Sequence, residues 1–355
     1  MVQVERNILS GVKNRDKNRA RGRAGTADEL ALLQKIERAA RSGGQNRQNF
    51  GIQLGIGDDA ALWRPRKGYE TVLTTDWFLE GRHFLRDVHP PESVGWKCLS
   101  RAVSDVAAIG GDPRCCLVSL ALPSDCAREW LDQYLKGLSR AARKLDCFLA
   151  GGDTTRFRAI LINVSVVGEV KSGTAVKRSG ARAGDRIFVS GKLGEAELGL
   201  TLLKKGKIGP RAEKALLQKH FYPTPRIALG SWLASNRLAT AMMDLSDGLS
   251  SDLARLCSAS GTGARIFREK LPVSGGAFAR RFDMKQRFNT ALHGGDDYEL
   301  LFCVKRSQAA RIPRRYAGVG LTEIGEITVR TGITLIDSSG NQSLLEAAGW
   351  DPFRK

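Results

Sequence analysis

Acidic residues in short, mostly glycine-rich turns recur six times along this chain of 355 residues. The six segments are 55–59 (GIGDD), 74–76 (TTD), 104–105 (SD), 151–155 (GGDTT), 244–248 (DLSDG) and 294–297 (GGDD). Aspartate beside glycine is common in ordinary turns, so any one of them is most simply structural. Several of the six, however, follow an apolar stretch that is typical of a β-strand. We therefore expect a fold that places several carboxylates at strand ends.

Apolar strands alternate with long helices over most of the chain. Strands are predicted over 71–75, 116–122, 148–150, 160–167, 185–190 and 299–304, with weaker β segments to the C-terminus; helices are predicted over 30–40, 92–110, 195–203, 226–236 and 249–260, and another is opened by 123–125. The first strand is expected to end in Asp76, and residues 204–224 form a lysine-rich connection or lid. This alternation predicts a mixed α/β fold.

The apolar residues of the helix at 92–110 form one stripe, made of Leu99, Ala102, Val103 and Val106. That spacing is helical. Asp105 lies outside the stripe, so its carboxyl group is expected to leave the core.

The length of the chain fits two domains of ordinary size. Residues 1–27 are basic and poor in large apolar side chains, which predicts a disordered extension. An N-terminal domain is expected over 28–170 and a C-terminal α/β domain over 171–355, with the boundary near residue 170.

The formal net charge of +19 is high for a soluble protein. Such a balance is compatible with nucleic-acid binding, but no basic motif interleaved with aromatic residues accompanies it. A basic host proteome, or a site for polyanionic small molecules, explains the charge more simply. No apolar run approaches the roughly 18 residues that span a bilayer, and the N-terminus lacks the apolar core of a secretory signal. With seven cysteines and no C-x-x-C pair, we expect a cytoplasmic protein with reduced thiols.

The acidic segments combine carboxylates with Ser and Thr hydroxyls. Oxygen ligands without neighbouring Cys or His suit Mg²⁺ rather than zinc or copper. Several cations held in this way would attract phosphates, whose charge they neutralise during phosphoryl transfer. The chain has no G-x-x-x-x-G-K-[ST] loop, no protein-kinase signature and no G-x-G-x-x-G after a strand. An ATP-dependent enzyme of a less common class is therefore indicated.

Seven ordered segments resemble the thiamine-monophosphate kinase family, part of the aminoimidazole ribonucleotide synthetase-like superfamily. They are 55–62 (GIGDDAAL), 74–84 (TTDWFLEGRHF), 104–113 (SDVAAIGGDP), 151–156 (GGDTTR), 177–185 (KRSGARAGD), 243–253 (MDLSDGLSSDL) and 294–302 (GGDDYELLF). The resemblance covers about residues 28–355. It implies a two-domain α/β fold shared with aminoimidazole ribonucleotide synthetase and selenophosphate synthetase, and a homodimer whose N-terminal domains pair. It also implies direct transfer of the ATP γ-phosphoryl group to thiamine phosphate, assisted by several Mg²⁺ ions.

The resemblance also implies roles for individual residues. The metal ligands would be Asp59, Thr74, Thr75, Asp76, Asp105, Asp153, Asp244 and Asp247. Gly152 and Asp153 would approach the nucleotide, and Arg178 and Ser246 would contact its phosphates. The thiamine moiety would face His83, Asp296 and Trp350, although the family usually has Glu at the position of Asp296. Catalysis would rest on Asp76, Asp105, Asp153 and Arg178.

Two alternatives stay open. The first is a sister enzyme of the same fold that phosphorylates another acceptor. A selenophosphate synthetase would want a reactive cysteine near its N-terminus, and none occurs before Cys98. The second, of a different class, is a basic nucleic-acid-binding protein, which only the charge supports.

Overall fold

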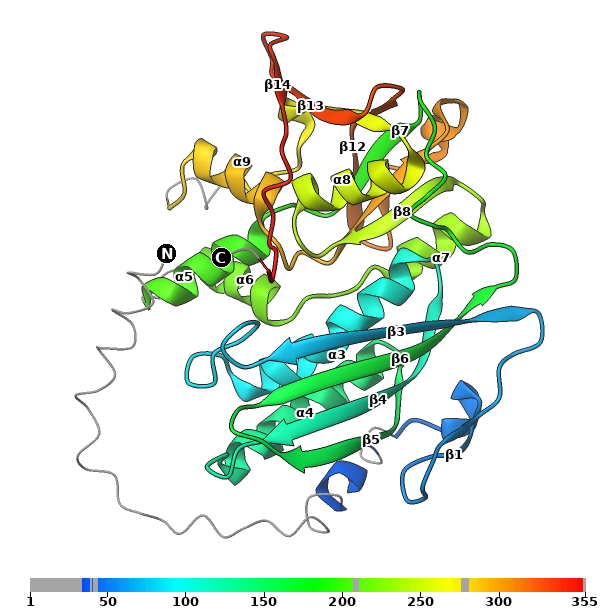
Figure 1. Ribbon diagram of the computed structural model, residues 1–355, viewed down its shortest axis with the longest axis vertical. Helices are drawn as coiled ribbons and strands as arrows, with labels where there is room; N and C mark the ends of the chain where they lie inside the picture. Colours follow the sequence, from blue (N-terminus) through cyan, green and yellow to red (C-terminus); the bar gives the residue numbers. More distant parts are fainter. Residues whose placement is uncertain (1–33, 39, 41–43, 207–210, 276–280, 354–355) are drawn as a thin grey trace.

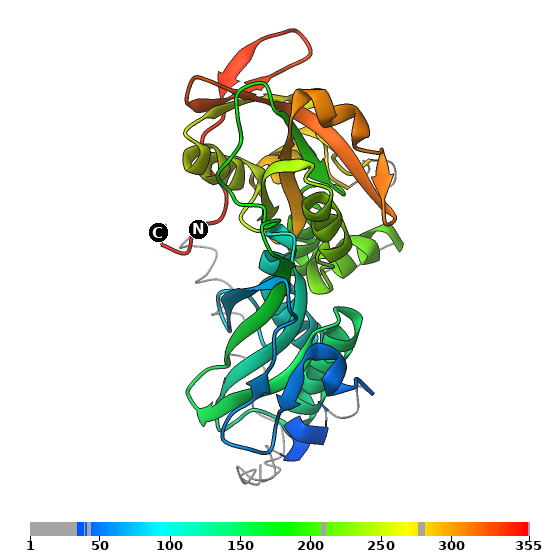
Figure 2. The same cartoon turned by 90° about the vertical axis from the view of Figure 1, so that its right-hand side faces the viewer.

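The computed structural model of the protein describes residues 34–38, 40, 44–206, 211–275 and 281–353. Two sheets with their helices lie one above the other in these ranges, as the two views in Figures 1 and 2 show. The predicted extension at 1–27 lies outside the described residues, as does much of the helix predicted over 30–40, of which 34–38 are helical. The mixed α/β prediction is confirmed.

The N-terminal region, residues 44–171, is built on a four-stranded sheet. Its strand order is β3 (Tyr69–Leu79), β6 (Leu161–Lys171), β4 (Asp112–Leu122) and β5 (Phe148–Arg156). Only β4 and β5 pair in parallel, across the helix that connects them. A short 3-10 turn, η1 (Arg47–Phe50), and the strands β1 (Ile52–Leu54) and β2 (Leu62–Trp63) precede the sheet.

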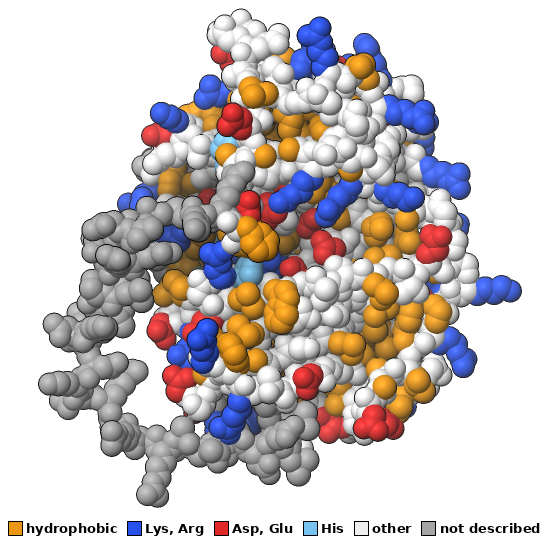
Figure 3. All heavy atoms as spheres, viewed as in Figure 1, with side chains coloured by type: hydrophobic (Ala, Val, Ile, Leu, Met, Phe, Trp, Pro, Cys, Tyr) orange, Lys and Arg blue, Asp and Glu red, His pale blue; other side chains and the backbone are white. Residues whose placement is uncertain are grey.

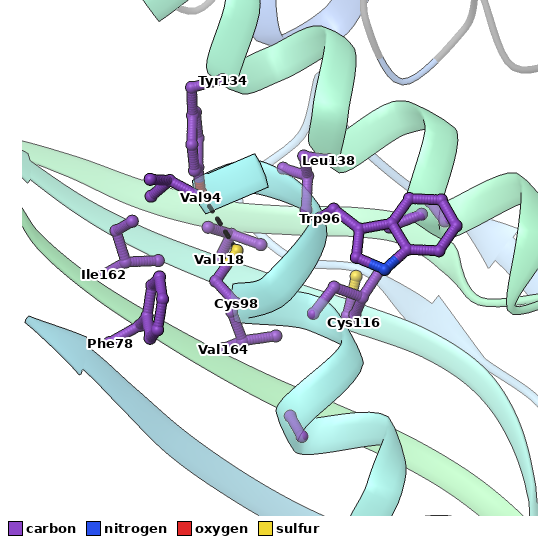
Figure 4. Packing of buried hydrophobic residues seen from close by; sticks show 14 of the residues in the cluster. Phe78, Val94, Trp96, Cys98, Cys116, Val118, Tyr134, Leu138, Ile162 and Val164 are labelled. Carbon is purple, nitrogen blue, oxygen red and sulfur yellow. Dashed lines mark hydrogen bonds between the residues drawn. The ribbon is translucent and has the colours of Figure 1, made fainter. Parts of the chain in front are cut away.

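Helices α3 (Pro91–Ala108) and α4 (Arg128–Lys144) cover one face of this sheet. All four residues of the predicted stripe of α3 are fully buried, which confirms that prediction. Figure 4 shows side chains of α3 between the sheet, represented by Phe78 and Val164, and Tyr134 of α4. The two helices pack closely because Gly137 has no side chain. A Cβ at this position would lie 1.9 Å from the carbonyl oxygen of Glu92.

Two strands are longer than predicted, because they continue through acidic segments that we expected to be turns. The strand β3 passes through 74–76 and ends only at Leu79, with Asp76 paired to Val164. The strand β5 passes through 151–155, where a Cβ on Gly152 would lie 1.9 Å from the carbonyl oxygen of Val118. Glycine thus allows close strand pairing here rather than a turn.

The C-terminal region, residues 172–353, holds the larger sheet. Its strands are β14 (Gln342–Leu344), β13 (Gly332–Ile336), β9 (Gly263–Phe267), β12 (Val319–Thr328), β7 (Arg186–Ser190), β10 (Glu299–Val304) and β8 (Ala239–Leu245) in spatial order, with β11 (Arg315–Tyr316) paired to β12. Its helices are α5 (Glu195–Lys205), α6 (Arg211–Phe221), α7 (Ile227–Ser235), α8 (Leu249–Ser260) and α9 (Met284–His293), with 3-10 turns η2 (Arg268–Lys270) and η4 (Arg306–Arg311). Helices α8 and α9 pack on one face of the sheet, and α7 packs on the other.

The lysine-rich connection or lid predicted over 204–224 contains helix α6, which was not predicted. Leu216 packs with Leu198 and Leu202 of α5, and a Cβ on Gly199 of α5 would lie 2.3 Å from the carbonyl oxygen of Leu216. The lysines of the segment had obscured this apolar face. Burial of such a face, rather than helix propensity, is what stabilises a short helix.

Helix α3 also makes the junction between the two regions. A Cβ on Gly230 of α7 would lie 2.1 Å from the carbonyl oxygen of Ala107. Helix α3 thus contacts α7, and through Ser104 it also contacts the end of β8 in the second sheet. Among the described residues, none of the helices has the length and apolar character required to cross a membrane.

Candidate active site at the junction of the two regions

A group of polar side chains lies where β3, α3 and the end of β8 meet. Thr74 Oγ1 donates a hydrogen bond of 2.6 Å to Asp105 Oδ2. Ser104 Oγ donates one of 2.7 Å to Asp244 Oδ2. Asp76, two residues along β3, faces Arg101 of α3. The junction thus brings together Thr74, Asp76, Asp105 and Asp244, four of the predicted metal ligands.

The carboxyl groups of this cluster repel one another. Burial raises the pKa of Asp105, the hydrogen bond from Thr74 opposes this rise, and the charge of Asp76 adds to it. Burial and the neighbouring Asp105 raise the pKa of Asp244 to about 8. Oxygen donors that repel each other in this way fit a divalent cation, which would relieve the repulsion. In the part of the chain that the structure describes, no three His, Cys, Asp or Glu side chains already form a closed metal-binding group.

Three of the other predicted metal ligands lie apart from this cluster. Because side chains alternate along β3, Thr75 points to the opposite face of the sheet, where its Oγ1 is 3.1 Å from both Asn163 Oδ1 and Ser165 Oγ. Asp153 is exposed on β5, and its Oδ1 accepts from its neighbour's backbone N–H. Asp59 is exposed in the loop between β1 and β2. Within the segment 74–76, Thr74 and Asp76 therefore face the junction, whereas Thr75 faces away from it.

The loop 246–248 at the start of α8 is organised around a carboxylate that the sequence analysis missed. Asp252 Oδ2 accepts three hydrogen bonds of 3.0–3.1 Å, from the backbone N–H groups of Ser246, Asp247 and Gly248. Arg255 pairs with both Asp252 and Asp247. The signal was present in the sequence as an acidic residue in the first turn of α8. Asp247 is thus held by a guanidinium group at the edge of the site.

A second polar group surrounds Asp296. Its Oδ2 accepts a 2.7 Å hydrogen bond from Lys97 Nζ, and its Oδ1 accepts one of 2.8 Å from the Tyr298 hydroxyl. Burial alone would raise the pKa of Asp296, but Lys97 and Arg101 hold it below the ordinary value. The sequence analysis did not single out Lys97, Arg101 or Tyr298. Lys97 is almost fully buried, and a buried lysine is rare unless it is paired.

His83 and Trp350, which are far apart in the sequence, meet in space. Their ring centroids are 5.5 Å apart with the planes tilted by 51°. His83 Nδ1 accepts a 2.9 Å hydrogen bond from the backbone N–H of Leu79. Burial, followed by the charge of Arg101, lowers the pKa of His83 to about 4, so its ring is neutral near pH 7.

The C-terminal segment that carries Trp350 lies against helix α8. The backbone N–H of Trp350 donates to the carbonyl oxygen of Asp247 at 2.9 Å. Trp350 also lines a cavity of about 530 Å³ together with Arg178, Ser251 and Arg255. Arg178, which was predicted to contact phosphate, and Trp350, which was predicted to contact the acceptor, therefore line the same cavity.

Two family models match the chain. The model described as the N-terminal domain of AIR synthase related proteins matches residues 57–170, and the corresponding C-terminal domain model matches 182–338. The chain thus has the AIR synthase related fold, and the polar cluster described above lies at the junction of its two matched parts.

More specific relatives narrow this class. The thiamine-monophosphate kinase of Escherichia coli (strain K12) is 37% identical over 306 residues, which are 85% of this chain and 92% of that protein. The Aquifex aeolicus (strain VF5) thiamine-monophosphate kinase is 38% identical over 304 residues, 84% and 92% of the two chains. The chain belongs to the thiamine-monophosphate kinase family.

Solved structures agree with this assignment. The crystal structure of thiamine-monophosphate kinase from Stenotrophomonas maltophilia K279a matches with a TM-score of 0.78 at 34% identity, covering 88% of this chain and 97% of that one. A structure described as "AaThiL complexed with AMPPCP and TMP" matches with a TM-score of 0.72 at 35% identity, covering 92% and 97%.

Proposed function

We propose that this protein transfers the γ-phosphoryl group of ATP to thiamine phosphate and so produces thiamine diphosphate. The observation that carries the proposal is the junction itself, where the Asp76–Asp105–Asp244 cluster lies beside the His83–Trp350 pair. One side suits cations and phosphates, and the other suits a flat aromatic acceptor. The related structure whose description names AMPPCP and TMP contains an ATP analogue and thiamine phosphate together.

Magnesium is part of this proposal. The ligands would come from Asp59, Thr74, Thr75, Asp76, Asp105, Asp153, Asp244 and Asp247. Bound Mg²⁺ would neutralise phosphate charge during transfer. Of these residues, Thr74, Asp76, Asp105 and Asp244 already converge, and the raised pKa of Asp244 is a reason for that cluster to bind a cation.

The chain's own residues would hold the two substrates. Gly152, Asp153, Arg178 and Ser246 would bind the nucleotide. Burial raises the pKa of both Asp105 and Asp244, and the charge of Arg178 partly opposes this rise, so Arg178 lies close enough to balance phosphate charge beside them. The acceptor phosphate is ionised near neutral pH, so its oxygen attacks in line without a general base. Catalysis by Asp76, Asp105, Asp153 and Arg178 then consists of positioning and charge balance.

The acceptor's thiamine moiety would lie against His83, Trp350 and Asp296. A neutral imidazole does not repel the cationic thiazolium ring, and a tryptophan face attracts it. Asp296 adds a negative charge whose position is fixed by Lys97 and Tyr298. A shorter side chain than the family's usual Glu can thus still present its carboxylate in a single orientation.

We also propose that the protein is a homodimer with domains at 28–170 and 171–355. On the sheet face opposite α3 and α4, η1 and β1 cover one part, where Phe50 and Ile52 pack with Cys115. Elsewhere on this face Leu73, Trp77 and Leu117 remain 75%, 54% and 42% exposed. Figure 3 shows hydrophobic side chains gathered over this lower part of the molecule. Pairing of two such faces would remove them from water.

The free thiols of all seven cysteines support a cytoplasmic location. Small-molecule substrates, rather than nucleic acid, account for the positive side chains Arg178, Arg255 and Arg101 around the junction.

An ADP-release assay over a panel of acceptors tests this function. Thiamine phosphate should support turnover in the presence of ATP and Mg²⁺, while thiamine, other phosphorylated heterocycles and DNA should not. Turnover with a different phosphorylated acceptor would favour a sister activity of the same fold. Salt-sensitive retention on DNA without any ADP release would favour the nucleic-acid alternative.

A further inference from the structure

Helix α3 presents a polar stripe to the junction as well as an apolar stripe to the core. Lys97, Arg101 and Asp105 follow one another at intervals of four residues, so they lie along one side of the helix. Lys97 contacts Asp296, and Asp105 contacts Thr74. Arg101 therefore lies between the acceptor side of the site and the metal side.

The guanidinium group of Arg101 forms two long hydrogen bonds with Asp76 and lies near a second carboxylate, that of Asp296. Its Nε and Nη2 are 3.3 and 3.4 Å from the two carboxylate oxygens of Asp76, and its Nη1 is 3.9 Å from Asp296 Oδ1. By contrast, Arg140 lies 2.7 Å from Glu92. At 3.9 Å two charges attract but form no hydrogen bond. Nη1 therefore forms no hydrogen bond with Asp296, and its N–H groups can donate to an anionic oxygen that approaches from another side.

Asp296 has closer partners than Arg101, whereas Asp76 pairs with Arg101 in this structure and would be shared with a bound cation. Asp296 already accepts close hydrogen bonds from Lys97 and Tyr298, one to each oxygen. Asp76 is a proposed metal ligand, and a bound cation would take over its charge. Arg101 then holds a positive charge in excess, on a side chain only 13% exposed. A buried cation needs a partner.

We propose that Arg101 binds the phosphate group of the acceptor and thereby selects a phosphorylated acceptor over the corresponding free alcohol. This inference rests on the proposed function, because it requires His83, Asp296 and Trp350 to hold the acceptor's ring system. A guanidinium group is charged at every physiological pH and binds two phosphate oxygens with its fork of N–H donors. The packing of Arg101 over the Phe78 ring, 5.4 Å from guanidinium carbon to centroid, holds that fork toward the junction.

Equilibrium binding without ATP tests this inference separately from turnover. Calorimetric titrations of the full chain with thiamine phosphate and with thiamine, both in Mg²⁺, give the preference for the phosphorylated ligand. In Arg101→Gln we expect this preference to fall at least about tenfold, with the affinity for thiamine changed by less than about twofold. An unchanged preference, or an equal loss of affinity for both ligands, would overturn the inference.

Two further variants make the result decisive. Arg140→Gln removes a guanidinium group from a surface ion pair with Glu92 and should leave both affinities at the wild-type level. If Arg101→Gln does not fold, Arg101→Lys decides, because it keeps the charge beside Asp76 but lacks the fork; its preference should fall at least about threefold, and no fall overturns the inference. If the wild-type protein binds neither ligand, the proposed function fails and the inference fails with it. If the wild-type protein binds both ligands and the Arg101 variants keep the wild-type preference, the inference fails while the proposed function stands.

Discussion

Ser104 on α3 donates a hydrogen bond of 2.7 Å to Asp244 at the end of β8, and this contact joins the two regions of the protein at the candidate active site. Asp244 is buried, and the neighbouring Asp105 raises its pKa further, to about 8. The hydroxyl group of Ser104 opposes this shift without cancelling it. Near neutral pH the cation-free site therefore favours a proton on Asp244.

The contribution of Asp244 to the stability of the cation-free protein should decrease as the pH rises from about 4 to about 8. Over this interval the folded chain holds a proton on Asp244 that the unfolded chain, with an ordinary Asp pKa near 3.9, has released. The free energy of unfolding should therefore fall by at most about 1.4 kcal/mol per pH unit from this group. Thermal unfolding in a chelator at several pH values measures the slope.

The variant Asp244→Asn isolates this contribution, since its amide does not titrate. Between pH 4 and 8 the slope of the free energy of unfolding against pH should be more positive for the variant than for the wild type. Mg²⁺ should also stabilise the wild type more at pH 8 than at pH 5, because a protonated carboxyl group is a poor ligand. Parallel pH profiles for the two proteins would contradict the pKa assigned to Asp244.

Replacement of the proposed metal ligands should impair turnover strongly. Asp76→Asn and Asp153→Asn should each reduce kcat by at least about 100-fold, because each removes a negative charge from the cation sites. Steady-state assays with Mg²⁺ titrated to saturation measure the effect. Asp132→Asn, which breaks only a surface pair with Lys35, is the matched control. Turnover within threefold of the parent in both active-site variants would rule out these ligands.

Trp350→Ala should weaken acceptor binding selectively. The ring faces His83, whereas the hydrogen bond to Asp247 comes from the backbone and survives the substitution. The KM for thiamine phosphate should rise roughly tenfold, as expected for a contact of about 1–2 kcal/mol. The KM for ATP should stay within about twofold and the Tm should hardly change. Phe353→Ala, at a side chain 92% exposed, serves as the control.

An equal rise of both KM values in Trp350→Ala, or a clear drop in its Tm, would instead identify Trp350 as an anchor of the C-terminal segment.

The exposed apolar residues on the sheet face opposite α3 and α4 predict a dimer with a mass near twice 38.7 kDa. Light scattering at micromolar concentration measures this mass. Leu73→Glu combined with Trp77→Glu should give a monomer, because each added charge would have to be buried at the interface. The exchange Leu62→Glu, at an exposed residue of β2 outside that sheet, should leave the dimer intact. A monomeric wild-type protein would contradict the proposed assembly.

Much of the fold followed from local pattern. The stripe of α3 was predictable because a helical backbone repeats its buried face every 3.6 residues. The strand at 299–304 was predictable because a short continuous apolar run suits a strand that is buried on both faces. The segments 74–76 and 151–155 were predicted wrongly as turns, because local pattern does not set their conformation. Whether a glycine–aspartate segment turns or stays extended depends on the strand beside it, here β6 and β4, which the local sequence does not reveal. Helix α6 was missed because its buried face exists only against α5.

The sequence by itself determined the kind of chemistry, since the number of carboxylates, the absence of metal-binding cysteines and the ordered family segments are all properties of the chain. It also determined much of the core of each region, because the spacing of apolar residues is a property of the local sequence. The tertiary structure alone decided which polar groups meet. Lys97 reaches Asp296, Arg101 lies between two carboxylates, and Thr75 is turned away from its neighbours. These relationships depend on how α3 is clamped between two sheets, and charge interactions fall off over a few ångströms, so only the packed structure could set them.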